Sequence, residues 1–245
     1  MKAFLPQLRI GLLAVLAVFS AASAAWAQGP AYLFVTGVSF DTAKIGVYAR
    51  ALPPIYAKNQ GRYLAVGGTG RGVTFVAAPF SNRSVIFAEF PDAAAMEGFW
   101  WGEDYRKAIR LRDGAGAFSV LGVTGTETLA QPRTDSTYLV MLMTPGEARK
   151  ADAADADMIK AVTQAGGTLM TRGFTREFRP LEGDTLFDRI AIIGWTGPQA
   201  RDQFLKGSRF KRLLAAGKSQ GYPFIVALDS PAVVKAAAAK PPSAP

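Results

Sequence analysis

Runs of apolar residues, separated by polar and glycine-rich segments, divide the first half of the chain into expected strands and helices. Runs rich in β-branched and aromatic residues are typical of strands, and apolar residues three and four positions apart are typical of helices that cover a sheet. The pattern predicts strands over residues 32–38, 61–66, 85–90 and 118–124. It predicts a helix from Asp41 or Thr42 that Pro53-Pro54 interrupts, and further helices from Asp92 and Asp104.

The same order of elements returns in the second half. The pattern predicts strands over residues 137–143, after Gly166-Gly167, and over 190–195 and 222–228, with helices over 147–165 and from Pro198. Tyr32 matches Tyr138 at an offset of 138 − 32 = 106, and Val85 matches Ile190 at 190 − 85 = 105. Matches that recur in order at one offset indicate an internal repeat.

The repeat predicts an α+β fold made of two tandem ferredoxin-like (βαββαβ) units. One such sheet with two helices on one face leaves its other face bare, and a second sheet can cover it. We therefore expect an intrachain body like a dimeric α/β-barrel, a monomer that is its own pseudo-dimer. The expected boundaries are 1–27 for a signal peptide, 28–125 and 137–229 for the two units, 126–136 for a linker and 230–245 for a disordered tail.

The first 27 residues have the three parts of a secretory signal peptide. Lys2 and Arg9 precede an apolar run over 10–22, and Ala25-Trp26-Ala27 fits the small-x-small rule for cleavage after Ala27. The apolar run is short for a membrane span, so the alternative of an uncleaved anchor is the less favoured one. We expect a periplasmic or secreted protein with no membrane span once the signal is removed.

Composition excludes several chemistries. The chain has no Cys and no His, which excludes disulfides, thiolate nucleophiles, a Ser-His-Asp triad and a haem on a proximal His. We expect no cofactor and no metal. The net charge of +9 favours anionic small molecules or anionic envelope polymers over nucleic acid as partners of an exported protein, and the basic residues between Arg201 and Lys218 are expected to form a solvated face.

Aromatic and basic residues gather near the end of the first unit, where Trp100 and Trp101 precede Tyr105, Arg106 and Arg112. Rings could stack on a planar ligand while an Arg pairs with its carboxylate. The alternative is a packing cluster whose Arg side chains are solvated. Two adjacent tryptophans cannot both face the core. The glycine-rich segment 67–72 lacks phosphate-loop spacing and is expected to be a flexible hairpin loop.

The first half resembles a bacterial family known as domain of unknown function 1330, of the dimeric α/β-barrel superfamily. The resemblance rests on Tyr48 and Pro53, on NQGRYLAVGG over 59–68, on FPDAAA over 90–95 and on GEDYR over 102–106. It adds Tyr48 and Arg62 to the candidate residues. Where the family often has Arg this chain has Val66, and Arg172 occupies the equivalent place in the second half.

The resemblance implies no reaction. The favoured hypothesis is a protein of the cell envelope that binds a small anionic or aromatic molecule, or a partner, without catalysis. One alternative is a cofactor-free enzyme of a monooxygenase-like or isomerase-like type, because Tyr and Arg could supply proton transfer and charge. Another is a structural or interaction module without a pocket. The candidate ligand-binding residues are Trp100, Trp101, Tyr105, Arg106, Arg112, Tyr48, Arg62 and Arg172.

Overall fold

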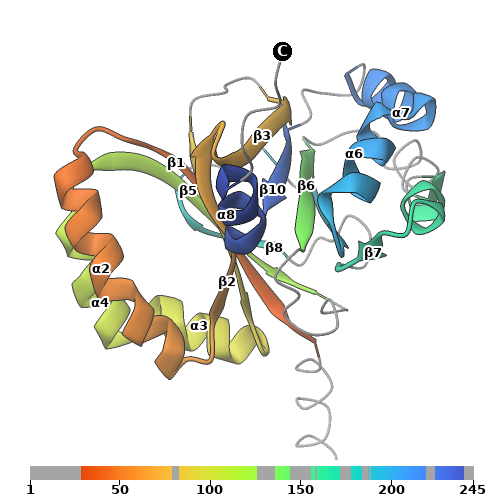
Figure 1. Ribbon diagram of the computed structural model, residues 1–245. Coiled ribbons are helices and arrows are strands. Elements are labelled where there is room, and N and C mark those ends of the chain that lie inside the picture. Colours follow the sequence, from red (N-terminus) through yellow and green to blue (C-terminus); the bar gives the residue numbers. More distant parts are fainter. Residues whose placement is uncertain are drawn as a thin grey trace, which may run out of the picture.

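A computed structural model describes residues 29–78, 83–125, 136–143, 156–157, 159–171, 178–183, 187, 189–218 and 224–239. The expected signal peptide, nearly all of the linker and the end of the tail lie outside these residues. Helices flank a curled sheet on two sides (Figure 1). Within the described part of the chain, no helix combines the length and the apolar character that a membrane span requires.

The first half follows the expected order of elements, with one additional strand. It contains β1 (Ala31–Ser39), α2 (Thr42–Lys58), β2 (Arg62–Thr69), β3 (Gly72–Ala77), β4 (Ser84–Phe90), α3 (Ala93–Trp101), α4 (Glu103–Ile109), the short 3-10 helix η2 (Arg110–Arg112) and β5 (Gly116–Thr124). Asp41 and Asp92 cap α2 and α3 by accepting hydrogen bonds from the backbone amides of Lys44 and Ala95. The helix starts are as predicted.

Pro53 and Pro54 do not interrupt α2, so the prediction of a break there was wrong. The helix continues through both prolines to Lys58. A proline lacks the N–H that would bond to the carbonyl four residues earlier, which weakens the helix at Ala49 and Arg50. Burial of Leu52 and Tyr56 against the sheet on either side of the prolines holds the helix together.

The second half contains the elements β6 (Thr137–Met143), β7 (Thr168–Leu169), β8 (Phe178–Glu182), β9 (Arg189–Trp195), α6 (Pro198–Lys206), α7 (Ser208–Lys218), β10 (Phe224–Asp229) and α8 (Pro231–Ala239). Of the expected helix over 147–165, residues 156–157 and 159–164 are described and are helical. Phe204, Phe210 and Leu214 of the expected buried stripe pack into the core of this half.

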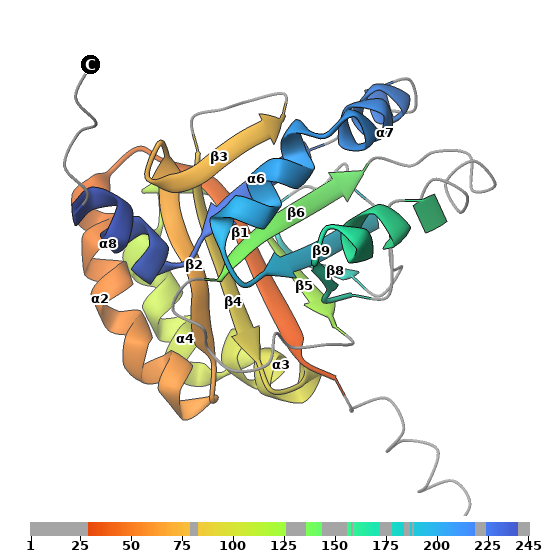
Figure 2. The same ribbon diagram turned by 45° about the vertical axis from the view of Figure 1, so that its right-hand side comes forward.

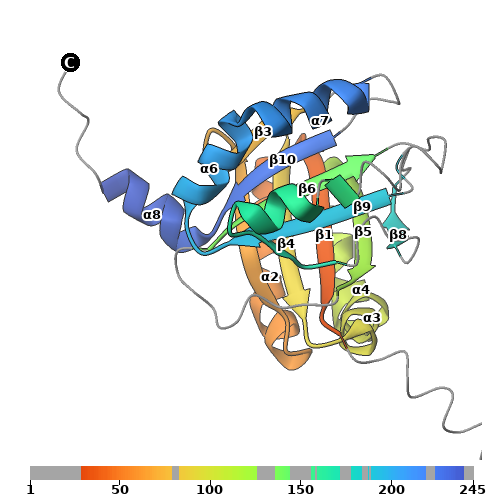
Figure 3. The ribbon, with the colours of Figure 1, turned by 90° about the vertical axis from the view of Figure 1, so that its right-hand side faces the viewer.

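The ten strands form one sheet in the order β7-β9-β6-β10-β3-β2-β4-β1-β5-β8. The strands β2-β4-β1-β5 in the first half and β7-β9-β6-β10 in the second have the same relative order, which is that of a ferredoxin-like unit. Figures 2 and 3 show the two sets facing each other, with helices on the outside of each. The expected α+β body of the dimeric α/β-barrel type is therefore confirmed.

Each half also gives a strand to the other. From the first half β3 pairs with β10, and from the second half β8 pairs with β5. Both pairings contain a bulge at equivalent positions, between Val120 and Leu121 in β5 and between Ile225 and Val226 in β10, where 225 − 120 = 105. This exchange was not predicted, because the sequence assigned residues 73–77 to no strand.

The core has three parts. One lies between the two sheets and combines residues of both halves, among them Phe34 and Phe87 from the first and Tyr138 and Phe224 from the second. The other two lie between each sheet and its own helices. Burial of apolar area is the largest favourable term in folding, so the shared part binds the two halves into one body.

Residues 231–239 were expected to belong to a disordered tail and are instead helix α8. The Ser230 hydroxyl accepts a hydrogen bond from the amide of Val233, and Pro231 occupies the first helical turn, where a missing N–H costs nothing. Val234 reaches Gly72 at the start of β3. The helix contacts β2, β3 and β10 (Figure 2), and this packing stabilises a segment with few large apolar residues.

Candidate functional site

A cavity of about 280 Å³ lies between α2 and the helix-facing side of the first sheet. We call it the tyrosine cavity, defined by Tyr48, Tyr56, Tyr63, Tyr105 and Arg112. The rest of its lining is mostly aliphatic or aromatic, contributed by β1, β2, β4, β5 and α2. Apolar walls with a few converging polar groups are typical of sites for small organic molecules.

The periodicity of the elements explains why these side chains meet. On α2, Ile45, Tyr48, Leu52 and Tyr56 are spaced three or four residues apart and therefore share the face that looks onto the sheet. On β1, alternation sends Leu33 and Val35 toward the helices, and Tyr32 and Phe34 toward the other sheet. The same helical and strand periods thus build the core and the cavity wall.

Two buried phenols form the polar centre of the cavity. The hydroxyl oxygens of Tyr48 and Tyr105 lie 3.0 Å apart, so one hydroxyl donates to the other. Burial, and next the proximity of Tyr48, raise the pKa of Tyr105 far above its usual value, although Arg112 acts in the opposite direction. Tyr105 is therefore a neutral phenol at physiological pH, and the hydroxyl that accepts within the pair retains its own proton for donation to a ligand.

Arg112 closes one end of the cavity and is itself buried. Its Nη1 donates to Glu182 Oε1 at 2.9 Å, and its Nη2 donates to the other oxygen of the same carboxylate. Its guanidinium carbon lies 4.3 Å from the ring centroid of Phe118 and 5.2 Å from that of Tyr48. Burial has the largest single effect on the pKa of Arg112 and lowers it, but Glu182 together with Tyr48 and Tyr105 outweighs burial and raises the pKa, so the guanidinium stays charged.

Four members of the lining are solvent-facing, two on α2, one on β2 and one at the start of β4. They are Ala49, Pro53, Val66 and Ser84, all of which are exposed, whereas Tyr48, Tyr105 and Arg112 are buried. This distribution places the mouth of the cavity at Val66 and its floor at the phenol pair. The mouth carries no charged side chain among these four residues.

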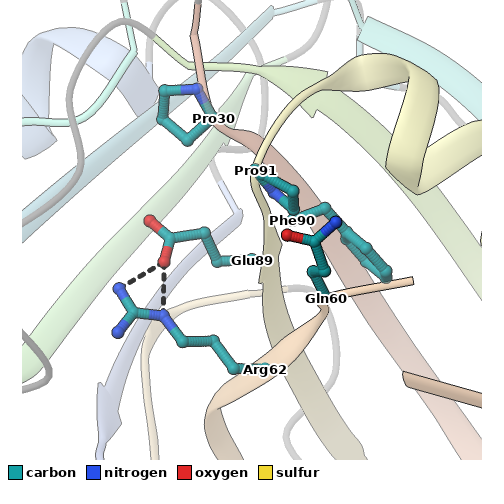
Figure 4. Close-up of a pocket in the computed structure, with 6 residues that line it drawn as sticks. All are labelled: Pro30, Gln60, Arg62, Glu89, Phe90 and Pro91. Carbon is teal, nitrogen blue, oxygen red and sulfur yellow. Dashed lines mark hydrogen bonds and ion pairs between the residues drawn. The ribbon is translucent and has the colours of Figure 1, made fainter. Parts of the chain in front are cut away.

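A second, more open pocket of about 310 Å³ lies where β1 begins, β2 begins and β4 ends (Figure 4). Arg62 Nε donates to Glu89 Oε2 at 2.6 Å across it, and Pro30, Gln60 and Pro91 form its sides. Arg62 and Glu89 already pair with each other in this pocket. The tyrosine cavity is the better candidate because it is more enclosed and richer in rings.

The structure separates the predicted site residues into several groups. Tyr48, Tyr105 and Arg112 meet in the tyrosine cavity, while Arg62 lines the second pocket. Arg172 lies outside the described residues.

The two tryptophans point in different directions, as predicted. Trp100 is 1% exposed and packs against Tyr105, so it belongs to the core. Trp101 is 58% exposed, with the guanidinium carbon of Arg106 at 5.8 Å from its ring centroid. Neither Trp101 nor Arg106 lines either pocket, so the structure does not bring both tryptophans together with Arg106 and Arg112 around these two pockets. Adjacent side chains on a helix point in different directions, so Trp101 faces outward while Trp100 faces the core.

Sequence reasoning missed three residues that shape the cavity. Tyr56 and Tyr63 both line it and pack in a tilted arrangement, with ring centroids 4.4 Å apart, and burial raises the pKa of each phenol. Glu182 reaches Arg112 from a strand of the other half. The spacing of Tyr56 eight residues after Tyr48 on one helix was a signal for the first of these.

Another finding corrects the expected solvated basic face. Arg201 is buried and donates to the carbonyl of Leu228 and to the carboxylates of Asp202 and Asp229. A buried guanidinium needs such partners, so this residue stabilises the second half rather than presenting a free charge. Among the described residues, no three acidic side chains come close enough to hold a metal ion.

Comparison with solved structures gives the same fold at low identity. A protein of Fusobacterium nucleatum subsp. nucleatum, provisionally named a monooxygenase, aligns with 9% identity and a TM-score of 0.50 over 83% of this chain and 93% of its own. One of Lactobacillus acidophilus with the same provisional name aligns with 12% identity and a TM-score of 0.47, over 82% and 93%. An anthrone oxidase-like protein aligns with 14% identity and a TM-score of 0.47, over 82% of this chain and 91% of its own. At these identities the likeness concerns the fold alone.

A search of curated protein sequences gives no match. The model of one family, described as Domain of unknown function (DUF1330), matches residues 30–126. These residues include every described side chain of the tyrosine cavity, whereas Glu182 lies beyond them. The repetition of this family in the second half stays a prediction. Residues 30–126 are therefore similar to the DUF1330 family, over less than half of the chain.

Proposed function

We propose that the first half binds a small, neutral aromatic molecule, of the size and polarity of a substituted phenol, in the tyrosine cavity. One observation carries the proposal: an enclosed cavity of about 280 Å³ is lined by rings and aliphatic groups, and the Tyr48–Tyr105 hydroxyl pair converges on it. The rings offer tilted and edge-on contacts to a planar ligand, and the hydroxyl pair offers one hydrogen bond that fixes its orientation.

The charge balance favours a neutral ligand over the anionic ones expected from the net charge of the chain. The positive charge of Arg112 is already matched by Glu182 inside the fold. Burial keeps the phenol of Tyr105 neutral, and Val66 at the mouth is apolar. A neutral ligand loses little hydration on entry, whereas an anion would lose its hydration without gaining an unpaired cation.

The proposal can be tested by calorimetric titration of the mature chain with para-cresol. Val66 and Val47 are each 46% exposed, but only Val66 lines the cavity. We expect the wild-type chain to bind one para-cresol, Val66→Trp to weaken binding at least about tenfold by blocking the mouth, and Val47→Trp to bind as the wild type does. Equal binding by both variants, or no binding by the wild type, would contradict the proposal.

A second candidate function is cofactor-free catalysis on the same ligand. It is favoured by the neutral phenol of Tyr105, which lies beside Tyr48 and near the guanidinium of Arg112. Fixed donors of this kind stabilise an oxygen on which negative charge develops. Mass spectrometry of a phenolic ligand incubated with the chain in air would detect conversion. If the wild-type chain converts the ligand and Tyr105→Phe does not, catalysis is supported. If the ligand is unchanged, catalysis fails and only the binding function is retained.

We also propose that the chain is exported and acts in the periplasm or outside the cell, on the strength of the N-terminal pattern ending in Ala25-Trp26-Ala27. The mature protein would begin at Gln28. N-terminal sequencing of the protein from a bacterial periplasmic extract tests this directly. A chain that keeps Lys2 and Arg9 and stays with the membrane fraction would refute it.

A further inference from the structure

The other half of the chain supplies the ion-pair partner of Arg112, a residue that lines the tyrosine cavity. Strand β8 pairs with β5 along the edge of the first sheet, with Glu182 opposite Val120. Leu181 packs into the core between the first sheet and its helices, and Glu182 meets Arg112. The carboxylate that faces Arg112 thus comes from residues that the DUF1330 match does not include.

The Glu182 carboxylate occupies hydrogen-bond donors that Arg112 could otherwise offer to a ligand. Both terminal nitrogens of the guanidinium donate to Glu182. The rings of Phe118 and Tyr48 lie against the guanidinium at 4.3 and 5.2 Å. A bidentate carboxylate is the arrangement in which a guanidinium binds an anion most favourably, so a ligand carboxylate would have to compete with Glu182 for the same edge.

We propose that Glu182 is a specificity-determining residue, which makes the tyrosine cavity select neutral aromatic molecules over aromatic carboxylates by occupying and neutralising Arg112. This inference rests on the proposed binding function and adds the selection between ligand classes. Without the negative charge of Glu182, the cavity would hold a buried and uncompensated cation. Such a charge is strongly unfavourable until an anion pairs with it.

The test compares two ligands that differ in one substituent. Para-cresol carries a methyl group where para-hydroxybenzoate carries a carboxylate, so the ratio of their dissociation constants reports the selection. We expect the wild-type chain to prefer para-cresol, and Glu182→Gln to shift the ratio toward para-hydroxybenzoate by about tenfold or more. Gln keeps the shape of Glu, removes its charge and replaces one acceptor oxygen by an NH2 group.

The second half supplies a matched control. Arg201 and Asp229 form an ion pair with side-chain exposures of 8% and 26%, against 7% and 29% for Arg112 and Glu182, and neither lines the cavity. Asp229→Asn should leave the ligand ratio unchanged. An equal shift in both variants would show a general effect of lost charge and overturn the proposal.

The outcomes separate this inference from the binding function itself. If the wild-type chain binds neither ligand, the binding function fails. If it binds para-cresol and Glu182→Gln keeps the wild-type ratio, the role of Glu182 fails alone. Should Glu182→Gln be largely unfolded, thermal unfolding is followed as para-hydroxybenzoate is added. A rise in the melting temperature that para-cresol does not produce supports the proposal, and its absence contradicts it.

Discussion

The ring of Phe87, on β4 of the first half, packs edge-on against the ring of Tyr138, on β6 of the second, with centroids 5.2 Å apart and planes at 72°. Both side chains are almost fully buried between the two sheets. Phe34 and Phe224 make a similar contact at 6.2 Å. The apolar face of each sheet therefore has the other sheet as its cover, and neither half buries its face alone.

Removal of the Phe87 ring should destabilise the whole chain. We expect Phe87→Ala to reduce the free energy of unfolding by about 3–5 kcal/mol, because it opens a cavity in a well-packed core. Unfolding in urea measures this change. Phe40→Ala is the control, since Phe40 is 72% exposed and its truncation should change stability by less than about 0.5 kcal/mol. Similar losses in the two variants would argue against a shared core.

A fragment of residues 28–125 should not remain a well-folded monomer. It would lose β8 and β10 and would expose the face that carries Phe34 and Phe87. An exposed apolar face of this size favours association. Light scattering after gel filtration should show dimers or larger species, and a monodisperse monomer with cooperative unfolding would contradict the argument.

Stability should fall at alkaline pH because several tyrosines hold their protons more tightly in the folded state. Burial raises the pKa of Tyr138 from 10.0 to about 12, and burial also raises the pKa values of Tyr56, Tyr63 and Tyr105. A raised folded pKa contributes stability that is complete below the unfolded pKa and is lost as the pH rises through the folded value. For Tyr138 this window runs from about pH 10 to about pH 12.

Tyr138→Phe isolates the contribution of one group to this alkaline loss. The free energy of unfolding of the wild type should drop between about pH 9 and about pH 11, and the variant should lose less, by up to about 1.4 kcal/mol per pH unit above 10. Urea unfolding at the two pH values checks the difference. Identical pH dependence in both chains would mean that Tyr138 ionises as freely in the fold as in water.

The Tyr48–Tyr105 hydrogen bond should appear as a coupling between two substitutions. Tyr48→Phe or Tyr105→Phe alone leaves the other hydroxyl buried without this partner, at a cost of about 1–3 kcal/mol. The double variant should cost less than the two single variants together. A double-mutant cycle by urea unfolding measures the coupling, and strict additivity would show that the hydroxyls do not interact.

Local patterns were sufficient for most elements, because capping residues and apolar periods act within a few positions of the chain. The strands β3 and β8 were missed since their partners, β10 and β5, belong to the opposite half. A strand that is stabilised by pairing with residues far away in sequence carries a weak local signal. Helix α8 was missed for a related reason. Its composition indicates a disordered tail, and the helix is stabilised by packing on β2 and β3, which lie far away in sequence.

The candidate site could be predicted only in part. Tyr105 and Arg112 were found from residue type and position, and Tyr48 from the family resemblance. Tyr63 was not assigned to the cavity, because a bulge between Tyr63 and Ala65 breaks the two-residue alternation from which the face of a strand is read. Glu182 lies 70 residues from Arg112 and meets it only through the strand exchange.

The most direct test of the binding function is a crystal structure of the mature chain with para-bromophenol, whose bromine marks its position by anomalous scattering. Our account predicts a single strong bromine peak inside the tyrosine cavity, with the phenol oxygen within hydrogen-bonding distance of Tyr48 or Tyr105. A cavity that stays empty while bromine is found elsewhere, or nowhere, would contradict it.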